Sequence, residues 1–214
     1  MRRLMFRNFA ADMKIFCIGR NYGEHARELQ NEIPEAPVVF MKPPTALLKG
    51  NDFYMPEFSN DMHYECELVF RIGKNGKHVD PIFAEKYIDA ISLGIDFTAR
   101  DIQAEQKKKG LPWEIAKAFD QSAVIGPWLP TAQFNTYPNL HFTMHKNGEL
   151  VQDGHAQDML FSPAILIAYI STYFTLQQGD ILFTGTPAGV GQVQIGDRLE
   201  GFLEDQKMFN IHIK

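Results

Sequence analysis

The chain has 214 residues, of which 45% are hydrophobic and 22% charged, the composition of an ordinary globular protein. A chain of this length can bury roughly 70% of its unfolded surface, so it needs no disulfides to hold a core. The composition excludes a disordered, a collagen-like and a coiled-coil protein.

The net charge argues against a nucleic acid as partner, and the apolar runs argue against a membrane. The chain carries 26 acidic against 21 basic residues, a net charge of −5, whereas binding to duplex nucleic acid usually needs a positive face. No uninterrupted apolar run reaches the roughly 18 residues of a membrane-spanning helix. The two cysteines, Cys17 and Cys66, form no CxxC pair, so a reducing, cytoplasmic location is expected.

The first thirteen residues differ from the rest. They hold three arginines, with no acidic residue before Asp12, and end on an internal Met13. An organelle transit peptide can have this composition, but serine is absent and the segment is short. We therefore interpret residues 1–13 as an N-terminal arm or a mis-assigned start. Residues 14–214 contain no repeat or linker and are predicted to form a single domain.

Most of the chain consists of short runs with β-strand character. Two Asn-Gly pairs, Asn75-Gly76 and Asn147-Gly148, predict hairpin turns, because both residue types tolerate positive φ angles. The predicted strands, in chain order, are Lys14–Gly19, Val38–Met41, Tyr64–Gly73, Ala90–Phe97, Ala123–Ile125, Leu140–Lys146, Asp180–Thr184, Arg198–Leu203 and Met208–Lys214.

Three helices are predicted between these strands. The first begins at Asn21, with a capping box, and continues to Gln30. The second begins near Thr98 and ends at Lys109, before Gly110. The third begins at Ser162-Pro163. Its predicted core-facing stripe is Ile165, Leu166, Tyr169, Ile170 and Tyr173. Because strands and helices do not alternate regularly, an α+β fold built on mainly antiparallel sheets is favoured over a doubly wound parallel sheet.

Three acidic residues are candidate metal ligands. Alternation along a strand places Glu65 and Glu67 on one face, and two adjacent carboxylates resist burial unless a cation joins them. Asp96 ends an apolar strand, where it can supply a third oxygen ligand. The alternatives are an edge strand that exposes both glutamates to water and a helix-capping role for Asp96, which Thr98 could perform equally well. Three carboxylates suit Mg²⁺ or Mn²⁺ better than Zn²⁺.

Two further features are candidates for chemistry. His25 and Glu28 lie three residues apart on the first predicted helix, so the carboxylate can fix the imidazole as a water-activating base; an exposed surface pair is the alternative. The glycine-rich segment from Phe183 to Gly191 can present backbone N–H groups to a carboxylate or oxyanion. It lacks the pattern of a phosphate loop, and a structural turn is the alternative.

Taken together and in order, these segments resemble the fumarylacetoacetate hydrolase family, and within it the single-domain branch of acylpyruvases and oxaloacetate decarboxylases. The resemblance covers about residues 14–214. The segments that carry it are Gly19-Arg20-Asn21-Tyr22 with His25 and Glu28, Lys42-Pro43, Glu65-x-Glu67, Asp96-Phe97-Thr98-Ala99-Arg100-Asp101, Lys109-Gly110-Leu111-Pro112-Trp113, Lys117 and Thr184-Gly185-Thr186-Pro187.

The resemblance implies a β-sandwich or roll with a few short helices, a homodimer, and one Mg²⁺ or Mn²⁺ in each subunit. Residues 14–214 are then a single catalytic domain. By matching motifs, Glu65, Glu67 and Asp96 fall at the positions of the metal ligands, and His25 with Glu28 at the catalytic dyad. The remaining implied residues are Lys117, which is catalytic and substrate-binding, and the substrate contacts Gln103, Thr186 and Arg20, the last of which could instead anchor its loop.

The implied activity is metal-dependent cleavage of a C–C bond in a small 2-oxo acid, as in acylpyruvate hydrolysis or oxaloacetate decarboxylation. The ion would act as a Lewis acid and Lys117 as a second positive group, while His25 with Glu28 would activate water for hydrolysis. The alternatives are a dienoate isomerase or decarboxylase of aromatic catabolism on the same scaffold, a non-catalytic oxo-acid-binding protein, and a structural β-sandwich.

Overall fold

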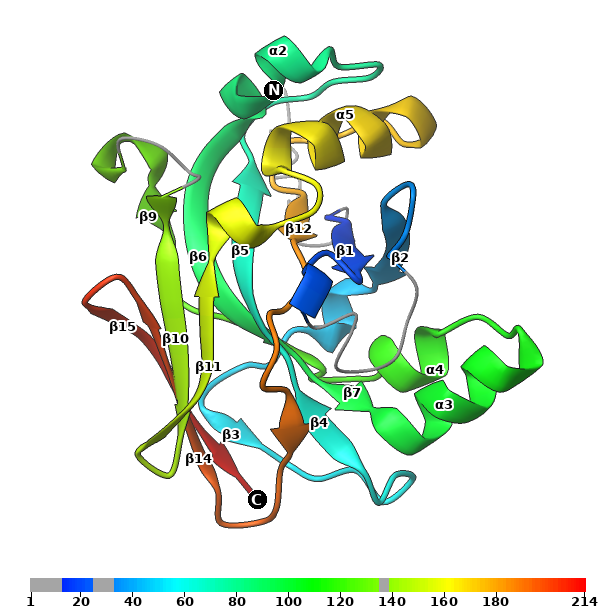
Figure 1. The fold of residues 1–214 in the computed structure, drawn as a ribbon, viewed down its shortest axis with the longest axis vertical. Helices are drawn as coiled ribbons and strands as arrows, with labels where there is room; N and C mark the ends of the chain where they lie inside the picture. Colours follow the sequence, from blue (N-terminus) through cyan, green and yellow to red (C-terminus); the bar gives the residue numbers. More distant parts are fainter. Residues whose placement is uncertain (1–12, 25–32, 135–138) are drawn as a thin grey trace, which may run out of the picture.

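A computed structural model describes residues 13–24, 33–134 and 139–214 and contains three β-sheets and a few short helices (Figure 1). The largest sheet has the order β2-β1-β12-β5-β6-β8, with β9 paired to β6. Its strands are β1 (Ile15–Gly19), β2 (Val38–Lys42), β5 (Cys66–Ile72), β6 (Ile88–Asp96), β8 (Ala123–Ile125), β9 (Leu129–Pro130) and β12 (Ile181–Phe183).

The other two sheets are smaller. One has the order β11-β10-β14-β15-β3 and the other the order β13-β4-β7. Their strands are β3 (Asp52–Phe53), β10 (His141–Lys146), β11 (Glu149–His155), β14 (Arg198–Leu203) and β15 (Gln206–Ile213), and then β4 (Met62–Tyr64), β7 (Thr98–Ala99) and β13 (Gly191–Gln192). The α-helices are α2 (Pro81–Ala84), α3 (Arg100–Lys109), α4 (Glu114–Lys117) and α5 (Pro163–Tyr173).

Antiparallel pairing dominates among the described strands. The parallel pairs are β1 with β12 and β3 with β15. The predicted α+β class with mainly antiparallel sheets is therefore confirmed. Strand β12 lies between β1 and β5, so the middle of the largest sheet joins the beginning of the chain to a segment near its end.

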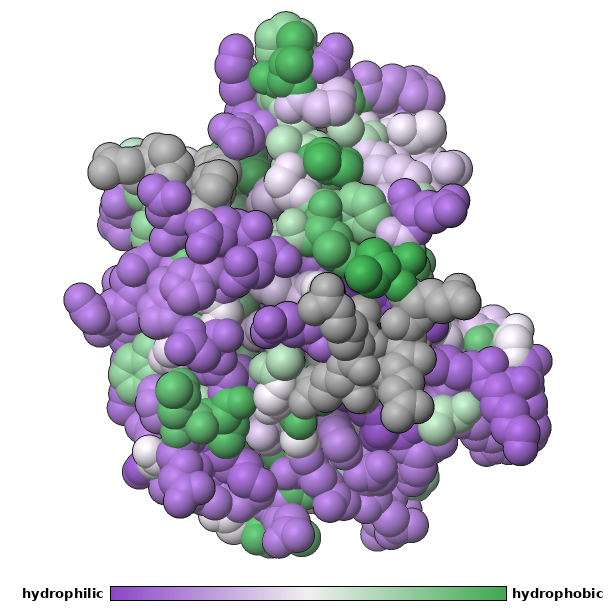
Figure 2. Space-filling model, in the orientation of Figure 1, coloured by the Kyte–Doolittle hydropathy of each residue, from purple (hydrophilic) through white to green (hydrophobic). Residues whose placement is uncertain are grey.

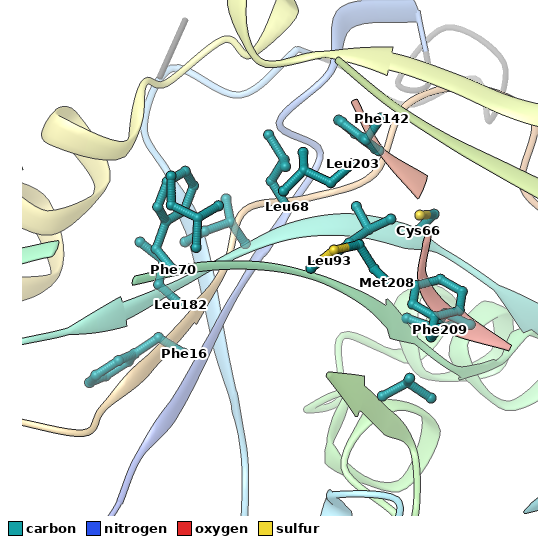
Figure 3. Packing of buried hydrophobic residues seen from close by; sticks show 14 of the residues in the cluster. Phe16, Cys66, Leu68, Phe70, Leu93, Phe142, Leu182, Leu203, Met208 and Phe209 are labelled. Atoms are coloured by element: carbon teal, nitrogen blue, oxygen red, sulfur yellow. The ribbon is translucent and has the colours of Figure 1, made fainter. Parts of the chain in front are cut away.

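The core lies on the face of β5 that carries Cys66, Leu68 and Phe70, as strand alternation predicts. These side chains belong to one buried cluster with Phe142 and Leu203 of the five-stranded sheet (Figure 3). On the opposite face of the largest sheet, a second, smaller apolar cluster forms around residues such as Val69. Glu67 projects from that opposite face, beside the smaller cluster.

Helices α2 and α4 were not predicted, and the two predicted helices α3 and α5 each depart from the expectations in one detail. Helix α3 begins at Arg100, because Thr98 and Ala99 form strand β7 and pair with β4; it ends at Gly110, whose φ of 66° closes the helix. In α5, Leu166 and Ile170 are buried as predicted, but Ile165 and Tyr173 are exposed. The predicted stripe was wrong at those two positions, because the helix buries the face that carries Leu166, Ile167 and Ile170.

One of the two predicted hairpin turns is confirmed. Asn147 and Gly148 have φ angles of 55° and 89° and connect β10 to β11, as a type I′ turn requires. The prediction at Asn75-Gly76 was wrong. Gly76 exchanges backbone hydrogen bonds with Leu176, and a Cβ atom at Gly76 would lie 2.3 Å from the Tyr87 ring. This glycine therefore serves a close approach of two segments rather than a tight turn.

The face of the molecule seen in Figure 2 is mostly hydrophilic, and the apolar side chains on it form separate patches, one of them over α2 and α5. The exposed apolar residues of these two helices include Ile82, Phe83 and Ile165. Within the three described ranges, no helix has the length and apolar character needed to cross a membrane.

Candidate functional site

Three carboxylates meet where β5 begins and β6 ends. Glu65, Glu67 and Asp96 each offer an oxygen within 4.8 Å of the others. The antiparallel register explains this convergence. Glu67 lies opposite Gly94, two residues before Asp96, so the two carboxylates project from the same face of the sheet. The backbone N–H of Asp96 donates to the carbonyl of Glu65 at 2.8 Å and fixes the third residue beside them.

This carboxylate centre (Glu65, Glu67 and Asp96) is buried. Glu67 is 1% exposed and Asp96 0%, and β5 is an interior strand between β12 and β6. The alternative of an edge strand that shows its glutamates to water is therefore wrong. Asp96 does not cap α3 either, since that helix begins four residues later.

Three basic side chains pair with the carboxylate centre. The Lys117 ammonium lies 2.7 Å from Glu65 Oε2 and 2.7 Å from Asp96 Oδ2. Lys42, at the end of β2, lies 2.7 Å from Asp96 Oδ1, and Arg100, at the start of α3, lies 2.7 Å from Glu65 Oε1. Lys42 also donates to the carbonyl of Lys117. The buried charges of Glu65 and Asp96 are thus paired, as burial of ionised groups requires.

The pKa values of Glu67 and Lys117 are both shifted in this buried site. Burial, then the charges of Asp96 and Glu65, raise the pKa of Glu67 well above its ordinary value. Burial alone would lower the pKa of Lys117, but the neighbouring Asp96 and Glu65 outweigh it and raise that pKa. Because burial and like charge both disfavour the ionised form of Glu67, a cation bound beside it would favour that form.

The segment after β12 closes over Glu67. The N–H of Gly185 donates to Glu67 Oε2 at 2.7 Å. Gly185 has a φ of 93°, and a Cβ atom there would lie 2.8 Å from the Cβ atom of Asn21, so only glycine fits. The Asn21 side chain donates to the carbonyl of Thr184 at 2.8 Å and ties the end of β1 to this segment. The glycine-rich segment thus presents an N–H group to a carboxylate of the protein itself.

Thr186 and Gln152 connect the same segment to β5 and β11. The Thr186 hydroxyl donates to the carbonyl of Cys66 at 2.8 Å and accepts from Gln152 Nε2 at 2.8 Å. Gln152 also donates to the carbonyl of Pro187 and accepts from the N–H of Cys66. Gln152 is 1% exposed. Sequence reasoning missed this residue, because its partners are distant in the chain.

Replacing Gln152 with Leu should lower the free energy of unfolding by about 1–3 kcal/mol, because buried polar groups at Cys66 and Pro187 lose their partners. Urea denaturation measures the loss. The matched control is Gln192→Leu, since the Gln192 side chain makes an exposed bond to the carbonyl of Asn60 and its loss should change stability by at most about 0.5 kcal/mol. Equal stability losses for the two variants would contradict the role given to Gln152.

A positively charged rim lies beside the carboxylate centre. It comprises Arg20, Arg100 and Lys107. Burial, then Arg100 and Arg20, lower the pKa of Lys107 to about 8, which indicates that these cations are near one another. Arg20 adopts a φ of 60°, and its buried Nε has no hydrogen-bond partner among the described residues. Gln103 is buried and accepts from Arg100 at 2.9 Å. Such groups can receive an anion.

His25 and Glu28 lie outside the described residues, so their dyad stays a prediction. Of the other histidines, His63 bonds to Asp61 at 2.8 Å rather than to the carboxylates; burial, then Arg100, lower its pKa. A cavity of about 330 Å³ lies beside the start of the predicted first helix, lined among others by Tyr22, Glu24 and Pro187.

The carboxylate centre fits a hard divalent cation. Its ligands are all oxygens and they are buried, and this burial together with the charges of Asp96 and Glu65 raises the pKa of Glu67. Mg²⁺ and Mn²⁺ favour such oxygen ligands. Glu65, Glu67 and Asp96 are the described residues that would hold the ion.

The comparisons with known proteins agree with this fold. A family model described as the C-terminal domain of fumarylacetoacetate hydrolase matches residues 14–214. The chain belongs to the fumarylacetoacetate hydrolase family. The family resemblance predicted from the motifs is therefore confirmed, and so is the expectation of an enzyme.

Relatives in the family carry different activities. The bovine mitochondrial oxaloacetate tautomerase FAHD1 is 41% identical over 187 residues, which cover 87% of this chain and 85% of that protein. The structure of fumarylpyruvate hydrolase from Pseudomonas aeruginosa, in complex with Mn²⁺ and pyruvate, matches with a TM-score of 0.89 at 35% identity and covers 94% of this chain and 88% of that chain. A 5-carboxymethyl-2-hydroxymuconate delta-isomerase from Mycobacterium smegmatis matches with a TM-score of 0.82 at 32% identity, covering 95% and 77%.

Proposed function

We propose that this member of the fumarylacetoacetate hydrolase family acts on a short 2-oxo dicarboxylic acid of the oxaloacetate or fumarylpyruvate type, and that it requires Mg²⁺ or Mn²⁺. The observation that carries the proposal is the buried carboxylate centre with Lys117 bonded to two of its three members. The named activities of the relatives agree with the 2-oxo acid chemistry expected from the sequence.

Charge balance supports a substrate with two carboxylates. The centre holds three carboxylates, and the three basic side chains Lys42, Arg100 and Lys117 pair with two of them, Glu65 and Asp96, so the formal charges of the six groups cancel. A divalent ion brings two further positive charges, which a dicarboxylate neutralises and a monocarboxylate does not. Buried charge is tolerated only when it is paired. The rim residues Arg20 and Lys107 add to the preference for a dianion.

The chemistry follows from where negative charge develops. When bound, a divalent ion supplies Lewis-acid stabilisation of the charge that grows on the 2-oxo oxygen. Lys117 provides a second positive charge near the 2-oxo oxygen, and its ammonium can donate a hydrogen bond to that oxygen. This stabilisation is strongest in a site that excludes water. Arg100 and Gln103 lie next to each other on α3, where they can orient a substrate carboxylate. Arg20 is a further candidate for that role, whereas the Thr186 hydroxyl would first have to release its bond to the carbonyl of Cys66.

The proposed reactions share this charge stabilisation and differ in proton transfer. Decarboxylation releases CO₂ without an attacking water. Tautomerisation, the activity named for the bovine relative, moves a proton between carbon and oxygen. Hydrolysis needs an activated water, which we assign to His25 with Glu28.

A substrate panel tests the proposal. Oxaloacetate and fumarylpyruvate carry two carboxylates and acetylpyruvate carries one, so the first two should give kcat/KM values at least about 10-fold higher, which corresponds to about 1.4 kcal/mol of charge recognition. Turnover should disappear with EDTA and return with Mg²⁺ or Mn²⁺. Absence of turnover for all three acids, together with tight binding of oxalate, would instead identify a binding protein. Turnover of dienoates alone would identify the isomerase alternative.

Replacing His25 with Ala should reduce hydrolysis of fumarylpyruvate by about 10²–10⁴-fold, the usual contribution of a general base. Loss of CO₂ from oxaloacetate should fall much less, because that reaction needs no activated water. The matched control is His78→Asn, which removes an exposed imidazole at a φ of 50° that Asn tolerates. Unchanged hydrolysis in His25→Ala would remove the dyad from the mechanism.

Two further expectations concern the oligomeric state and the location of the protein. We propose a homodimer, which light scattering in solution tests through a mass twice that of the chain. A cytoplasmic location also stays a proposal; several relatives, among them the bovine protein, are named as mitochondrial.

A further inference from the structure

Two histidines and an aspartate form a second cluster on the outer face of the five-stranded sheet. Ring nitrogens of His141 and His155 and a carboxylate oxygen of Asp153 all lie within 4.8 Å of one another. His141 Nε2 lies 2.6 Å from Asp153 Oδ1, and the two imidazole rings stack with centroids 4.4 Å apart. The residues come from β10 and β11, which run side by side (Figure 1).

A β-bulge creates this cluster. From the Asn147-Gly148 turn, the hairpin pairs His145 with Leu150, but beyond the bulge Met144 pairs with Gln152. The shift by one residue places His155 opposite His141; an unbroken register would place Gly154 there. Bulges re-aim side chains in this way.

The pairing type brings the two imidazoles close. His141 donates its N–H to Glu204 Oε1 and accepts from the N–H of Glu204 through its carbonyl. Its backbone groups therefore point away from β11. His141 and His155 thus form a non-hydrogen-bonded pair, in which opposite side chains lie nearest to each other.

We propose that His141, Asp153 and His155 form a second metal site, which binds a borderline transition-metal ion such as Zn²⁺ or Co²⁺. Two imidazoles and a carboxylate are a ligand set typical of Zn²⁺ and unsuited to Mg²⁺. Tetrahedral coordination with bonds of about 2.0–2.2 Å needs ligand atoms roughly 3.3 Å apart. The ligand atoms already lie within 4.8 Å of one another, and because the side chains of His141 and Asp153 are partly exposed, we expect side-chain rotation to adjust them to that spacing.

The two centres differ in the ions they select. The carboxylate centre offers only oxygen ligands from buried residues, whereas the His141–Asp153–His155 cluster offers two nitrogens at the surface. The second site exists independently of the proposed function. Gln152, next to Asp153 on β11, bonds to Thr186 and to Cys66, and Cys66 lies between Glu65 and Glu67 in the chain.

The experiment titrates the full chain with Zn²⁺ alone, in the presence of excess Mg²⁺ that keeps the carboxylate centre occupied. Calorimetry should detect a Zn²⁺ ion at the second site, and NMR should show shifts of the ring nitrogens of His141 and His155. His155→Ala and Asp153→Asn should each weaken that binding by at least about 10-fold, since loss of even a supporting group of a metal site has such an effect.

The matched control is His145→Gln, on the same strand as His141 but outside the cluster. It should bind Zn²⁺ as the unchanged chain does. Zn²⁺ could also displace Mg²⁺, so the titration is repeated in Glu67→Gln, where binding at the histidine cluster should persist. Equal affinity of His155→Ala and His145→Gln, or ring-nitrogen shifts that leave out His141 and His155, would overturn the proposal.

Discussion

Glu67→Gln should reduce turnover of oxaloacetate and fumarylpyruvate by at least about 10³-fold, because the Lewis acid contributes several kcal/mol of charge stabilisation and each 1.36 kcal/mol is a factor of ten. It should also abolish the rise in melting temperature that Mg²⁺ or Mn²⁺ causes by binding the folded state. Without metal, the variant should be at least as stable as the unchanged chain. The amide oxygen can keep the bond from Gly185, while one of three crowded negative charges disappears.

Kinetics and thermal unfolding with and without metal check this expectation. Glu149→Gln, which removes an exposed carboxylate on β11, is the matched control and should leave turnover and the metal-induced shift unchanged. Normal Mg²⁺-dependent turnover in Glu67→Gln would reject Glu67 as a metal ligand.

Lys117→Met should give the opposite pattern of stability. Turnover should fall by about 10²–10³-fold, the effect of removing one donor to a developing oxyanion. Without metal, the free energy of unfolding should fall by about 3–5 kcal/mol, because Glu65 and Asp96 lose a buried cation. A divalent ion should restore much of this loss, since it neutralises the same carboxylates.

Glu67→Gln and Lys117→Met therefore distinguish a residue that binds the metal ion from a residue that acts on the substrate. Lys109→Met is the matched control, because Lys109 makes only an exposed pair with Glu105 on α3 and should change neither activity nor stability appreciably. If Lys117→Met lost the metal-induced rise in melting temperature, Lys117 would be part of the structure of the ion site rather than a group that acts on the substrate.

Most of the longer strands could be predicted from the sequence because strand alternation is a local property; β11 was missed, although the Asn147-Gly148 turn before it was predicted. The same alternation placed Glu65 and Glu67 on one face, away from Leu68. It could not show that β5 is an interior strand, since that depends on β12, more than a hundred residues further along the chain. The interpretation of exposed glutamates failed for this reason. The two-residue strands β3, β7, β9 and β13 were missed, because so few residues carry no periodicity.

The candidate site could be predicted only in part. Strand patterns made the three acids candidates, and motif resemblance supported them and supplied Lys117. Lys42 and Arg100 stood in motifs, but nothing in their spacing indicated that they pair with Asp96 and Glu65. The histidine cluster was missed altogether. It requires the bulge between Met144 and His145, whereas a turn signal alone predicts an unbroken register.

The place of β12 between β1 and β5 has a consequence for synthesis on the ribosome. The N–H group that holds Glu67 belongs to Gly185, which follows β12, and Lys14 and Asp180 meet across the same parallel pairing. A nascent chain therefore carries all three acids long before it carries the segment that closes over them. Contacts so distant in sequence form slowly, so the emerging polypeptide cannot close the carboxylate centre until Gly185 has been synthesised.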